Sequence, residues 1–173
     1  TCTGSPWKRP KEAAKKAVKG KRVAIIGGRR IPFCRANTNY VHQSNQDMMT
    51  ATLQAVVDAF KLGGERLGDV ALGAVIKHSR DWNLAREGVL GTTLAPETPA
   101  FDRQRAGGTS LEAAILIGNK IALGQIDAGI AAGTDTISDA PIVYPDEYAQ
   151  VLLASARGRS FGERLKPWLG LRP

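Results

Sequence analysis

A glycine pair, Gly107 and Gly108, precedes the most apolar helical segment of the chain. Thr109 follows the pair and Glu112 stands three residues later, a spacing that predicts a capping box at a helix start. Glycines let the backbone turn sharply there, and the first amide N–H groups and the positive end of the helix dipole face whatever lies above. Unpaired donors at a helix start are the setting in which helices bind anions.

Other polar side chains offer weaker candidates for catalysis. Thr109 and Ser110 carry hydroxyls, but no base accompanies them, and capping explains Thr109 more simply than nucleophilic attack does. His42 and His78 each stand in a polar loop without a carboxylate at suggestive spacing. We therefore expect both to be surface histidines.

The cysteines and the first glycine pair predict neither a metal site nor a nucleotide site. Cys2 and Cys34 lack metal-ligand spacing, so we expect two free thiols and no bound metal. Gly27-Gly28 follows an apolar run, but the G-x-G-x-x-G spacing of a dinucleotide loop is absent. A plain turn at the end of a strand is the better interpretation.

The helix that must position the glycine pair is predicted over residues 109–123. Its first two turns carry apolar side chains all round: Leu111, Ala113, Ala114, Ile115, Leu116 and Ile117. A helix without a polar face has to be covered on every side, which a single sheet does not do. We therefore predict one fully buried helix.

Apolar runs and helical stripes alternate along the rest of the chain. Strands are predicted at residues 23–26, 70–76 and 127–132, with a weaker one at 100–105, and helices at about 45–62 and 83–90. Ser44 or Asn45 is expected to cap the first helix. The alternation favours the α/β class, with a mixed, mainly parallel sheet and helices on both faces.

Charge divides the chain into three parts. The net charge is +8, yet residues 1–22 hold eight Lys or Arg and one Glu, residues 157–173 hold five and one, and the centre is slightly acidic. Basic residues confined to the ends favour a solvated extension over a nucleic-acid-binding body. We predict a flexible basic extension at 1–22, an α/β domain at 23–140 and the start of a further, loop-rich domain at 141–173.

Nothing in the chain approaches the roughly 18 consecutive apolar residues of a membrane span. Residues 148–171 mix apolar side chains with arginines, so peripheral membrane contact and a substrate-covering loop both stay open. The scarcity of cysteines and the absence of a secretory signal favour the cytoplasm, with the mitochondrial matrix as the alternative.

Four segments resemble the thiolase family. Residues 98–141 resemble the region around the family's nucleophilic cysteine, with the sequence TPAFDRQRAGGTSLEAAILIGNKIALGQIDAGIAAGTDTISDAP. The segment from Val23, VAIIGGRRIPF, resembles the family's opening strand. The segment from Asn83, NLAREGVL, resembles the start of one of its helices. ARGRSFGERL from Ala156 is similar to the β-subunit type of fatty-acid-oxidation trifunctional complexes. The four occur in the family's order and cover residues 23–173.

The resemblance implies the N-terminal half of a thiolase and an acyl-CoA C-acyltransferase activity. A cysteine thioester would carry the acyl group from a 3-ketoacyl-CoA to coenzyme A, so acyl-CoA and coenzyme A are expected as substrates and no bound cofactor is expected. The family's Gly-His-Pro, Asn-Glu-Ala-Phe and second-cysteine motifs do not occur in the 173 residues. The resemblance also implies a homodimer or tetramer formed through this half, and a possible fatty-acid-oxidation partner subunit.

The departure from the family lies at the nucleophile. Gly107 occupies the place of the cysteine, and Gly108 and Thr109 correspond to the helix start that would hold an oxyanion. Arg105 adds a long cation just before this turn. A glycine cannot form a thioester, so we predict no thiolytic activity, whether the substitution is designed or natural. The alternative is a non-catalytic, thiolase-like module that binds acyl-CoA or assembles with a partner.

Overall fold

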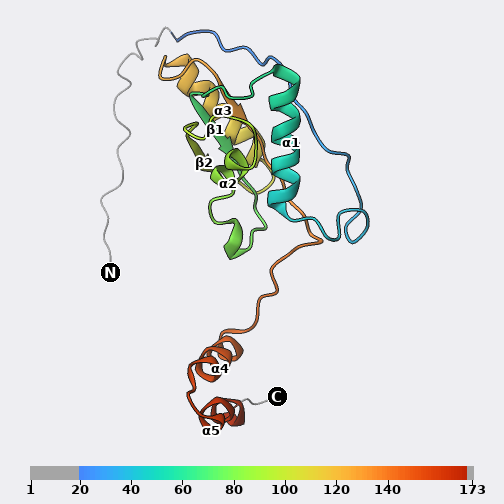
Figure 1. Ribbon diagram of the computed structural model, residues 1–173, viewed down its shortest axis with the longest axis vertical. Helices are drawn as coiled ribbons and strands as arrows, with labels where there is room; N and C mark the ends of the chain where they lie inside the picture. Colours follow the sequence, from blue (N-terminus) through green and yellow to red (C-terminus); the bar gives the residue numbers. More distant parts are fainter. Residues whose placement is uncertain (1–19, 171–173) are drawn as a thin grey trace, which may run out of the picture.

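The computed structural model describes residues 20–170, and its centre is a small parallel sheet (Figure 1). The strands are β1 (Asp69–Leu72), β2 (Ala100–Asp102) and β3 (Gly129–Ala131), in the spatial order β2-β1-β3. Val70 lies opposite Ala100 in one pair and opposite Ile130 in the other. The predicted α/β class and parallel sheet are confirmed, with each strand shorter than its apolar run.

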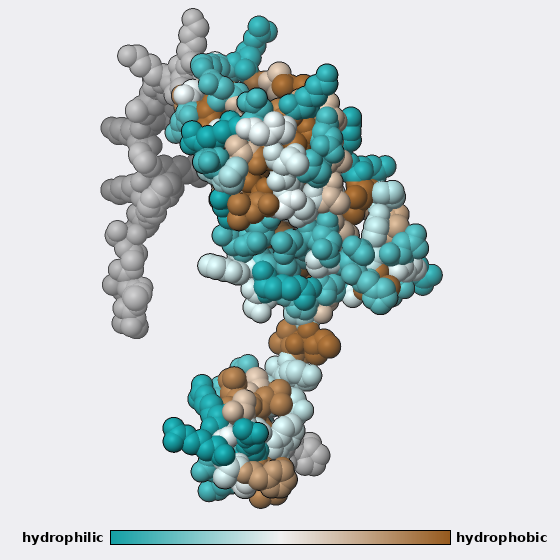
Figure 2. Space-filling view, in the orientation of Figure 1, coloured by the Kyte–Doolittle hydropathy of each residue, from teal (hydrophilic) through white to brown (hydrophobic). Residues whose placement is uncertain are grey.

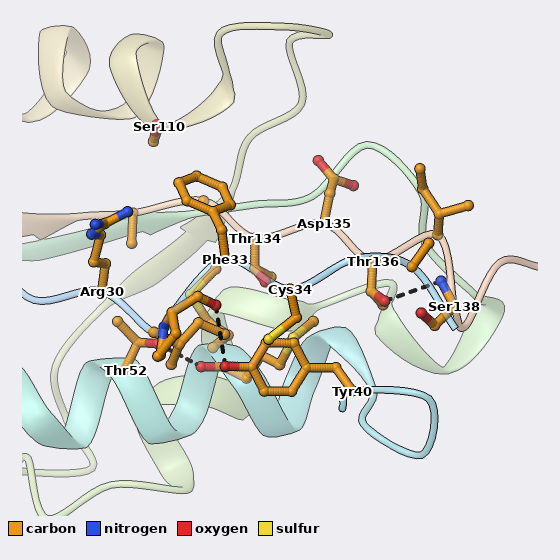
Figure 3. A pocket seen from close by; sticks show the side chains of 18 of the residues that line it. Arg30, Phe33, Cys34, Tyr40, Thr52, Ser110, Thr134, Asp135, Thr136 and Ser138 are labelled. Carbon is orange, nitrogen blue, oxygen red and sulfur yellow. Dashed lines mark hydrogen bonds between the residues drawn. The ribbon is translucent and has the colours of Figure 1, made fainter. Parts of the chain in front are cut away.

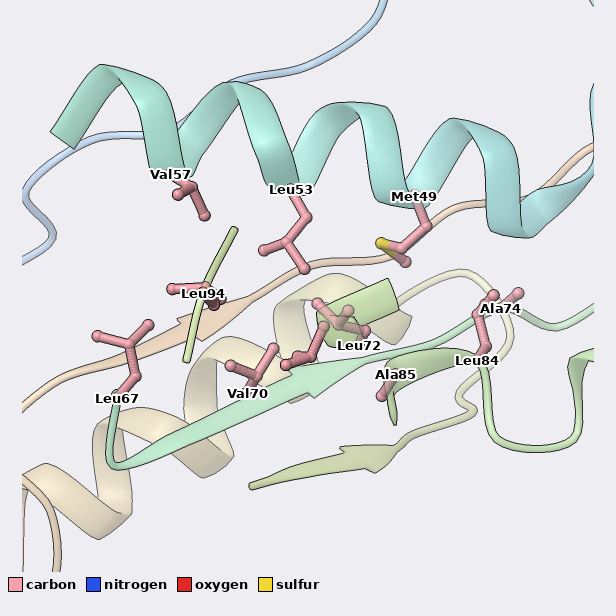
Figure 4. Close-up of a cluster of buried hydrophobic side chains, with 11 residues drawn as sticks. Met49, Leu53, Val57, Leu67, Val70, Leu72, Ala74, Leu84, Ala85 and Leu94 are labelled. Atoms are coloured by element: carbon pink, nitrogen blue, oxygen red, sulfur yellow. The ribbon is translucent and has the colours of Figure 1, made fainter. Parts of the chain in front are cut away.

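Helices cover both faces of this sheet. Helix α1 (Asn45–Phe60) and helix α2 (Leu84–Leu90) pack on one face, and helix α3 (Thr109–Ala122) packs on the other. Figure 4 shows Met49, Leu53 and Val57 of α1 pointing at the strand that carries Val70 and Leu72. This buried cluster holds the α1 side of the domain together by removing apolar side chains from water.

The start of α1 follows from a local hydrogen-bond pattern. The Ser44 hydroxyl accepts the Asp47 amide at 3.1 Å, and the Asp47 carboxylate accepts the Ser44 amide at 2.9 Å. This is a complete capping box. Because the carboxylate accepts the Ser44 amide and also the Ser44 hydroxyl, the latter at 2.7 Å, the pKa of Asp47 is held below its ordinary value.

A carboxylate from β2 positions α2. Asp102 accepts the amides of Leu84 and Ala85, at 3.2 and 2.7 Å, and pairs with the Lys77 ammonium at 2.7 Å. The Asn83 side chain makes no capping bond at this helix start. The strand therefore supplies the cap that the local sequence lacks.

Helix α3 differs from the prediction of full burial. Thr109, Ala113 and Ile117 face the sheet, but Leu111 is 66% exposed and Ile115 is 48% exposed. One sheet covers one face of a helix, and no other element among residues 20–170 covers the opposite face. The prediction of a fully buried helix was therefore wrong for the described residues. Its premise, that a single sheet cannot cover such a helix on every side, is correct.

The predicted strand at residues 23–26 is not formed. Residues 20–35 have no regular secondary structure and run outside the sheet, and Ile25 is 93% exposed. Both edges of β1 are already paired with β2 and β3, and residues 23–26 pair with neither outer strand. An apolar run in a sequence indicates that its residues favour burial, but it does not determine which element they pack against.

A helical lobe follows the sheet domain. Helices α4 (Asp146–Arg157) and α5 (Phe161–Leu165) pack with the 3-10 helix η2 (Lys166–Gly170), and Tyr148 contacts Trp168 edge to face. Figure 2 shows apolar surface on the connecting segment, where Ile142 and Val143 are largely exposed. None of the helices among the described residues has the length and apolar content needed to cross a bilayer. Most of the predicted basic extension, residues 1–19, lies outside the described residues.

Candidate functional site

The predicted glycine turn stands directly at the start of α3. Gly107 has φ +74°, in the left-handed region that favours glycine, and Gly108 is the N-cap residue. Gly107 is exposed, and a Cβ built on it would meet nothing within 4 Å. The position therefore has room for a side chain, at the cost of a left-handed backbone conformation of about 1 kcal/mol.

Thr109 does not form the predicted capping box. Gly108 has no side chain to cap the helix, and the Thr109 hydroxyl instead donates to the Arg105 carbonyl at 2.9 Å and accepts the Arg105 amide at 3.1 Å. These two bonds close the turn over residues 105–109. Because no capping side chain covers them, the first-turn amides of α3 keep the unpaired donor character expected from the sequence.

Glu112 binds two arginines that precede the glycine turn. Its carboxylate accepts hydrogen bonds from the guanidinium groups of Arg105 and Arg103, the latter at 3.2 Å. The hydrogen bond from Arg105, with a smaller contribution from Arg103, lowers the pKa of Glu112. Arg105, an unexplained cation in the sequence, therefore ties the turn to the helix.

The loop after β3 passes close beneath the first turn of α3. A Cβ built on Gly133 would lie 3.1 Å from the Ser110 amide nitrogen and 3.2 Å from the Ser110 Cβ. Further along, the Asp135 carboxylate accepts the amides of Val75 and Ile76, both at 2.8 Å. Asp135 thus joins the segments that follow β3 and β1 at the same end of the sheet.

A pocket of about 490 Å³ opens beside this loop. It lies between α1, the segment after β3 and the extended residues 29–36, and Ser110 of α3 also reaches it (Figure 3). Gly107, Gly108 and Thr109 do not line it. The pocket and the glycine turn are therefore neighbouring features joined by the first turn of α3.

Cys34 and Tyr40 meet inside this pocket. The Tyr40 hydroxyl donates to the Pro32 carbonyl at 3.2 Å, and the Cys34 sulfur lies beside it in Figure 3. Desolvation raises the pKa of Tyr40, and the neighbouring Cys34 thiol raises it further. Cys34 is a free thiol, as expected, whereas Cys2 lies outside the described residues.

The histidine prediction was half wrong. His42 is exposed, but His78 is half-buried, and its Nε2 lies 2.9 Å from the Asp139 carbonyl and 3.3 Å from the Asp139 carboxylate. Asp139 is 61 residues away, so no sequence spacing could suggest the pair. Among residues 20–170, no group of three or more His, Cys, Asp or Glu is placed to hold a metal ion.

Sequence reasoning missed Asp102, Asp135 and the pocket-lining arginines Arg29, Arg30 and Arg35. One signal was available for the carboxylates, because each follows or ends a strand and the carboxyl ends of parallel strands meet at one edge of a sheet. No signal in the sequence could place the three arginines at the pocket. They belong to a segment that sequence patterns predicted to be a strand followed by a loop, and such patterns do not show where a loop runs.

Comparisons with known proteins give a consistent result. Residues 23–160 match the family model described as the N-terminal domain of thiolase. The chain is 35% identical over 147 residues to a 3-ketoacyl-CoA thiolase of Vibrio cholerae (85% of this chain, 34% of the relative). It is 33% identical over 156 residues to one of Shewanella sp. strain W3-18-1 (89% and 36%).

A solved structure agrees at the level of the fold. The crystal structure of the Bacillus anthracis acetyl-CoA acetyltransferase superposes with a TM-score of 0.60 at 19% identity, covering 64% of this chain and 28% of that one. The chain spans about a third of the length of the curated relatives it matches.

Proposed function

Because the chain belongs to the thiolase family, we propose that it supplies the N-terminal half of an acyl-CoA C-acyltransferase scaffold whose nucleophile position is occupied by Gly107. As written, the scaffold would bind acyl-CoA without catalysing thiolysis. The observation that carries this proposal is the glycine turn, in which an exposed position with space for a side chain stands directly before the unpaired amides of α3.

The physical chemistry of this helix start suits a cysteine nucleophile. A thiol before a helix N-terminus has its pKa lowered by the dipole and nearby N–H groups. Such a thiolate would attack the 3-keto carbonyl, breaking the bond to the α-carbon; the acetyl-CoA carbanion then takes up a proton. Coenzyme A thiolate would next attack the thioester and release the cysteine. The donors at the helix start would stabilise the oxyanion in both steps.

Gly107 removes the first of these steps. Without sulfur no thioester forms, while the donors of α3 and the space above Gly107 remain. The proposed protein therefore keeps an acyl-CoA-binding surface and loses turnover. Cys34 is not placed to substitute, because it lines the neighbouring pocket and Gly107 does not.

The exposed face of α3 supports assembly with another unit. Leu111 and Ile115 lie on a helix that sits between the sheet and solvent in this chain, and apolar side chains at such a face favour burial against a partner. We propose that the second half of the family's subunit, or a second copy in a homodimer or tetramer, covers it.

A fatty-acid-oxidation partner subunit and peripheral membrane contact are secondary proposals, as is a location in the cytoplasm or mitochondrial matrix.

A chimeric enzyme tests the proposal. The aligned region of the Vibrio cholerae 3-ketoacyl-CoA thiolase would be replaced by this chain, once with Gly107 and once with Gly107→Cys, and cleavage of acetoacetyl-CoA would be followed by absorbance. We expect turnover only from the cysteine version, and acyl-CoA binding from both. Thr109→Ser is the matched control, because it changes the same turn while keeping the hydroxyl.

The outcomes separate the two readings of the chain. Turnover by the Gly107 chimera would overturn the predicted inactivity. A soluble, folded Gly107→Cys chimera without turnover would instead favour the non-catalytic module, an alternative supported by the exposed face of α3. Circular dichroism and size-exclusion chromatography establish that each chimera is folded before activity is compared.

A further inference from the structure

The pocket beside α1 has an apolar floor. Met48 and Met49 of α1 are buried, and Ala131 and Ala132 at the end of β3 complete the base. Methionine side chains adapt their shape to an apolar ligand because they are unbranched and flexible. A volume of about 490 Å³ falls within the range of roughly 300–1,000 Å³ typical of small-molecule sites.

The mouth of the pocket is strongly basic. Arg29, Arg30 and Arg35 line it from the extended segment, and none of them takes part in the ion pairs formed within residues 20–170. The guanidinium of Arg30 lies 5.3 Å from the centre of the Phe33 ring, which also lines the pocket. In the part of the chain that the structure describes, these cations have no anionic partners.

The pocket's own carboxylate does not neutralise the arginines. Asp135 is the only acidic side chain that residues 20–170 contribute to the lining, and it accepts two backbone amides, from Val75 and Ile76. Hydroxyls from Ser110, Thr134 and Thr136 add donors between the floor and the mouth. An apolar base below a cationic, donor-rich mouth complements a ligand with an apolar tail and an anionic head.

We propose that this pocket binds a small amphiphilic anion, an acyl chain of medium length that ends in a carboxylate or phosphate head. The tail lies on Met48 and Met49, and the head lies between Arg30 and Arg35. This site goes beyond the proposed acyl transfer, because it uses neither Gly107 nor the coenzyme.

The test uses the 173-residue chain and four probes with the same eight-carbon tail: octanoate, octyl phosphate, octanol and octylamine. Calorimetry measures affinity, and protection of Cys34 from N-ethylmaleimide in a Cys2→Ser background reports where the probe binds, because Cys34 lines the pocket. We expect saturable binding of octanoate or octyl phosphate with slowed Cys34 alkylation. The tighter of the two anions identifies the head group. Octanol should bind about tenfold more weakly, and octylamine should not bind.

Variants locate the site. Arg30→Gln and Arg35→Gln should each weaken anion binding about tenfold, the loss expected for one charge-assisted hydrogen bond. Thr52→Phe, on the α1 wall, should block the tail. Arg159→Gln in the helical lobe is the matched control and should leave affinity unchanged. The arginines are exposed, so their replacement leaves the core intact even if Thr52→Phe disturbs α1.

Three results would overturn the proposal: no binding of either anion, equal binding of octanol, or binding that neither protects Cys34 nor responds to the arginine variants. Each concerns binding by this chain alone. A failure here would leave the chimeric turnover test unaffected, and an inactive chimera would not alter these binding results.

Discussion

Thr109 closes the turn that contains Gly107 by hydrogen bonding to both backbone groups of Arg105, donating at 2.9 Å and accepting at 3.1 Å. The side chain is 8% exposed, so water does not readily replace these bonds. A side-chain hydroxyl inside the turn, rather than a capping side chain at Gly108, therefore contributes to the stability of the candidate site, together with the backbone bond from the Gly108 amide to the Arg105 carbonyl at 2.9 Å.

Replacing Thr109 with Ala should lower the free energy of unfolding by about 1–2 kcal/mol, because the Arg105 amide loses its acceptor and the Arg105 carbonyl keeps only the Gly108 amide as a donor. Urea denaturation followed by circular dichroism measures the change. Thr109→Ser should retain most of the stability, and so should Ser110→Ala. Equal losses in Thr109→Ala and Thr109→Ser would show that the methyl group matters instead.

Asp102→Asn should destabilise the chain by about 1–3 kcal/mol, because the carboxylate caps α2 and pairs with Lys77 in a setting where both side chains are less than 20% exposed. The control is Asp127→Asn. The ion pair between Asp127 and Lys21 is largely exposed, so its loss should lower the free energy of unfolding only slightly. Comparable losses in the two variants would contradict the capping role.

Protonation of Glu112 should loosen the turn at acid pH. Its folded-state pKa lies below the ordinary value, so the stabilisation is present above the unfolded pKa of about 4.5 and is lost as the pH falls through the lower folded value. Glu112→Gln should remove this contribution and flatten the stability profile below pH 4.5, whereas Glu147→Gln on α4 should not. Urea midpoints recorded between pH 2.5 and 7 provide the measurement.

Gly73→Ala should prevent normal packing between β1 and β2. A Cβ at this position would lie 1.7 Å from the Arg103 carbonyl oxygen, which is backbone and cannot move aside without breaking the Arg103–Leu72 hydrogen bond. We expect a loss above about 3 kcal/mol or no soluble protein. Gly118→Ala in α3 meets nothing within 4 Å and should stabilise by about 0.5–1 kcal/mol. A neutral Gly73→Ala would argue against this strand register.

Leu111→Ser together with Ile115→Ser should reduce self-association of the chain without destabilising it, because both side chains lie on the uncovered face of α3. Sedimentation velocity over a range of concentrations would measure the association. The matched control is Ala113→Ser, which places a hydroxyl on the buried face and should lower stability instead. Association unchanged by the double variant would mean that another surface mediates it.

Much of the fold could be predicted because it depends on neighbours in the chain. Ser44, expected with Asn45 as the alternative to cap α1, is the N-cap residue, and Met49, Leu53 and Val57 repeat at helical spacing. The order of the strands and helices and the parallel class follow from the same local patterns. The glycine turn is equally local, and its position before α3 agrees with the structure.

Tertiary structure alone decided which partners these elements found. The run at residues 23–26 has the composition of a buried strand, yet it pairs with neither of the two edge strands, β2 and β3, and remains outside the sheet. Thr109 and Glu112 have the spacing of a capping box, yet Arg105 takes the hydroxyl and Arg103 and Arg105 take the carboxylate. Local patterns report what a residue prefers, whereas long-range competition among donors, acceptors and apolar faces selects the contact that forms.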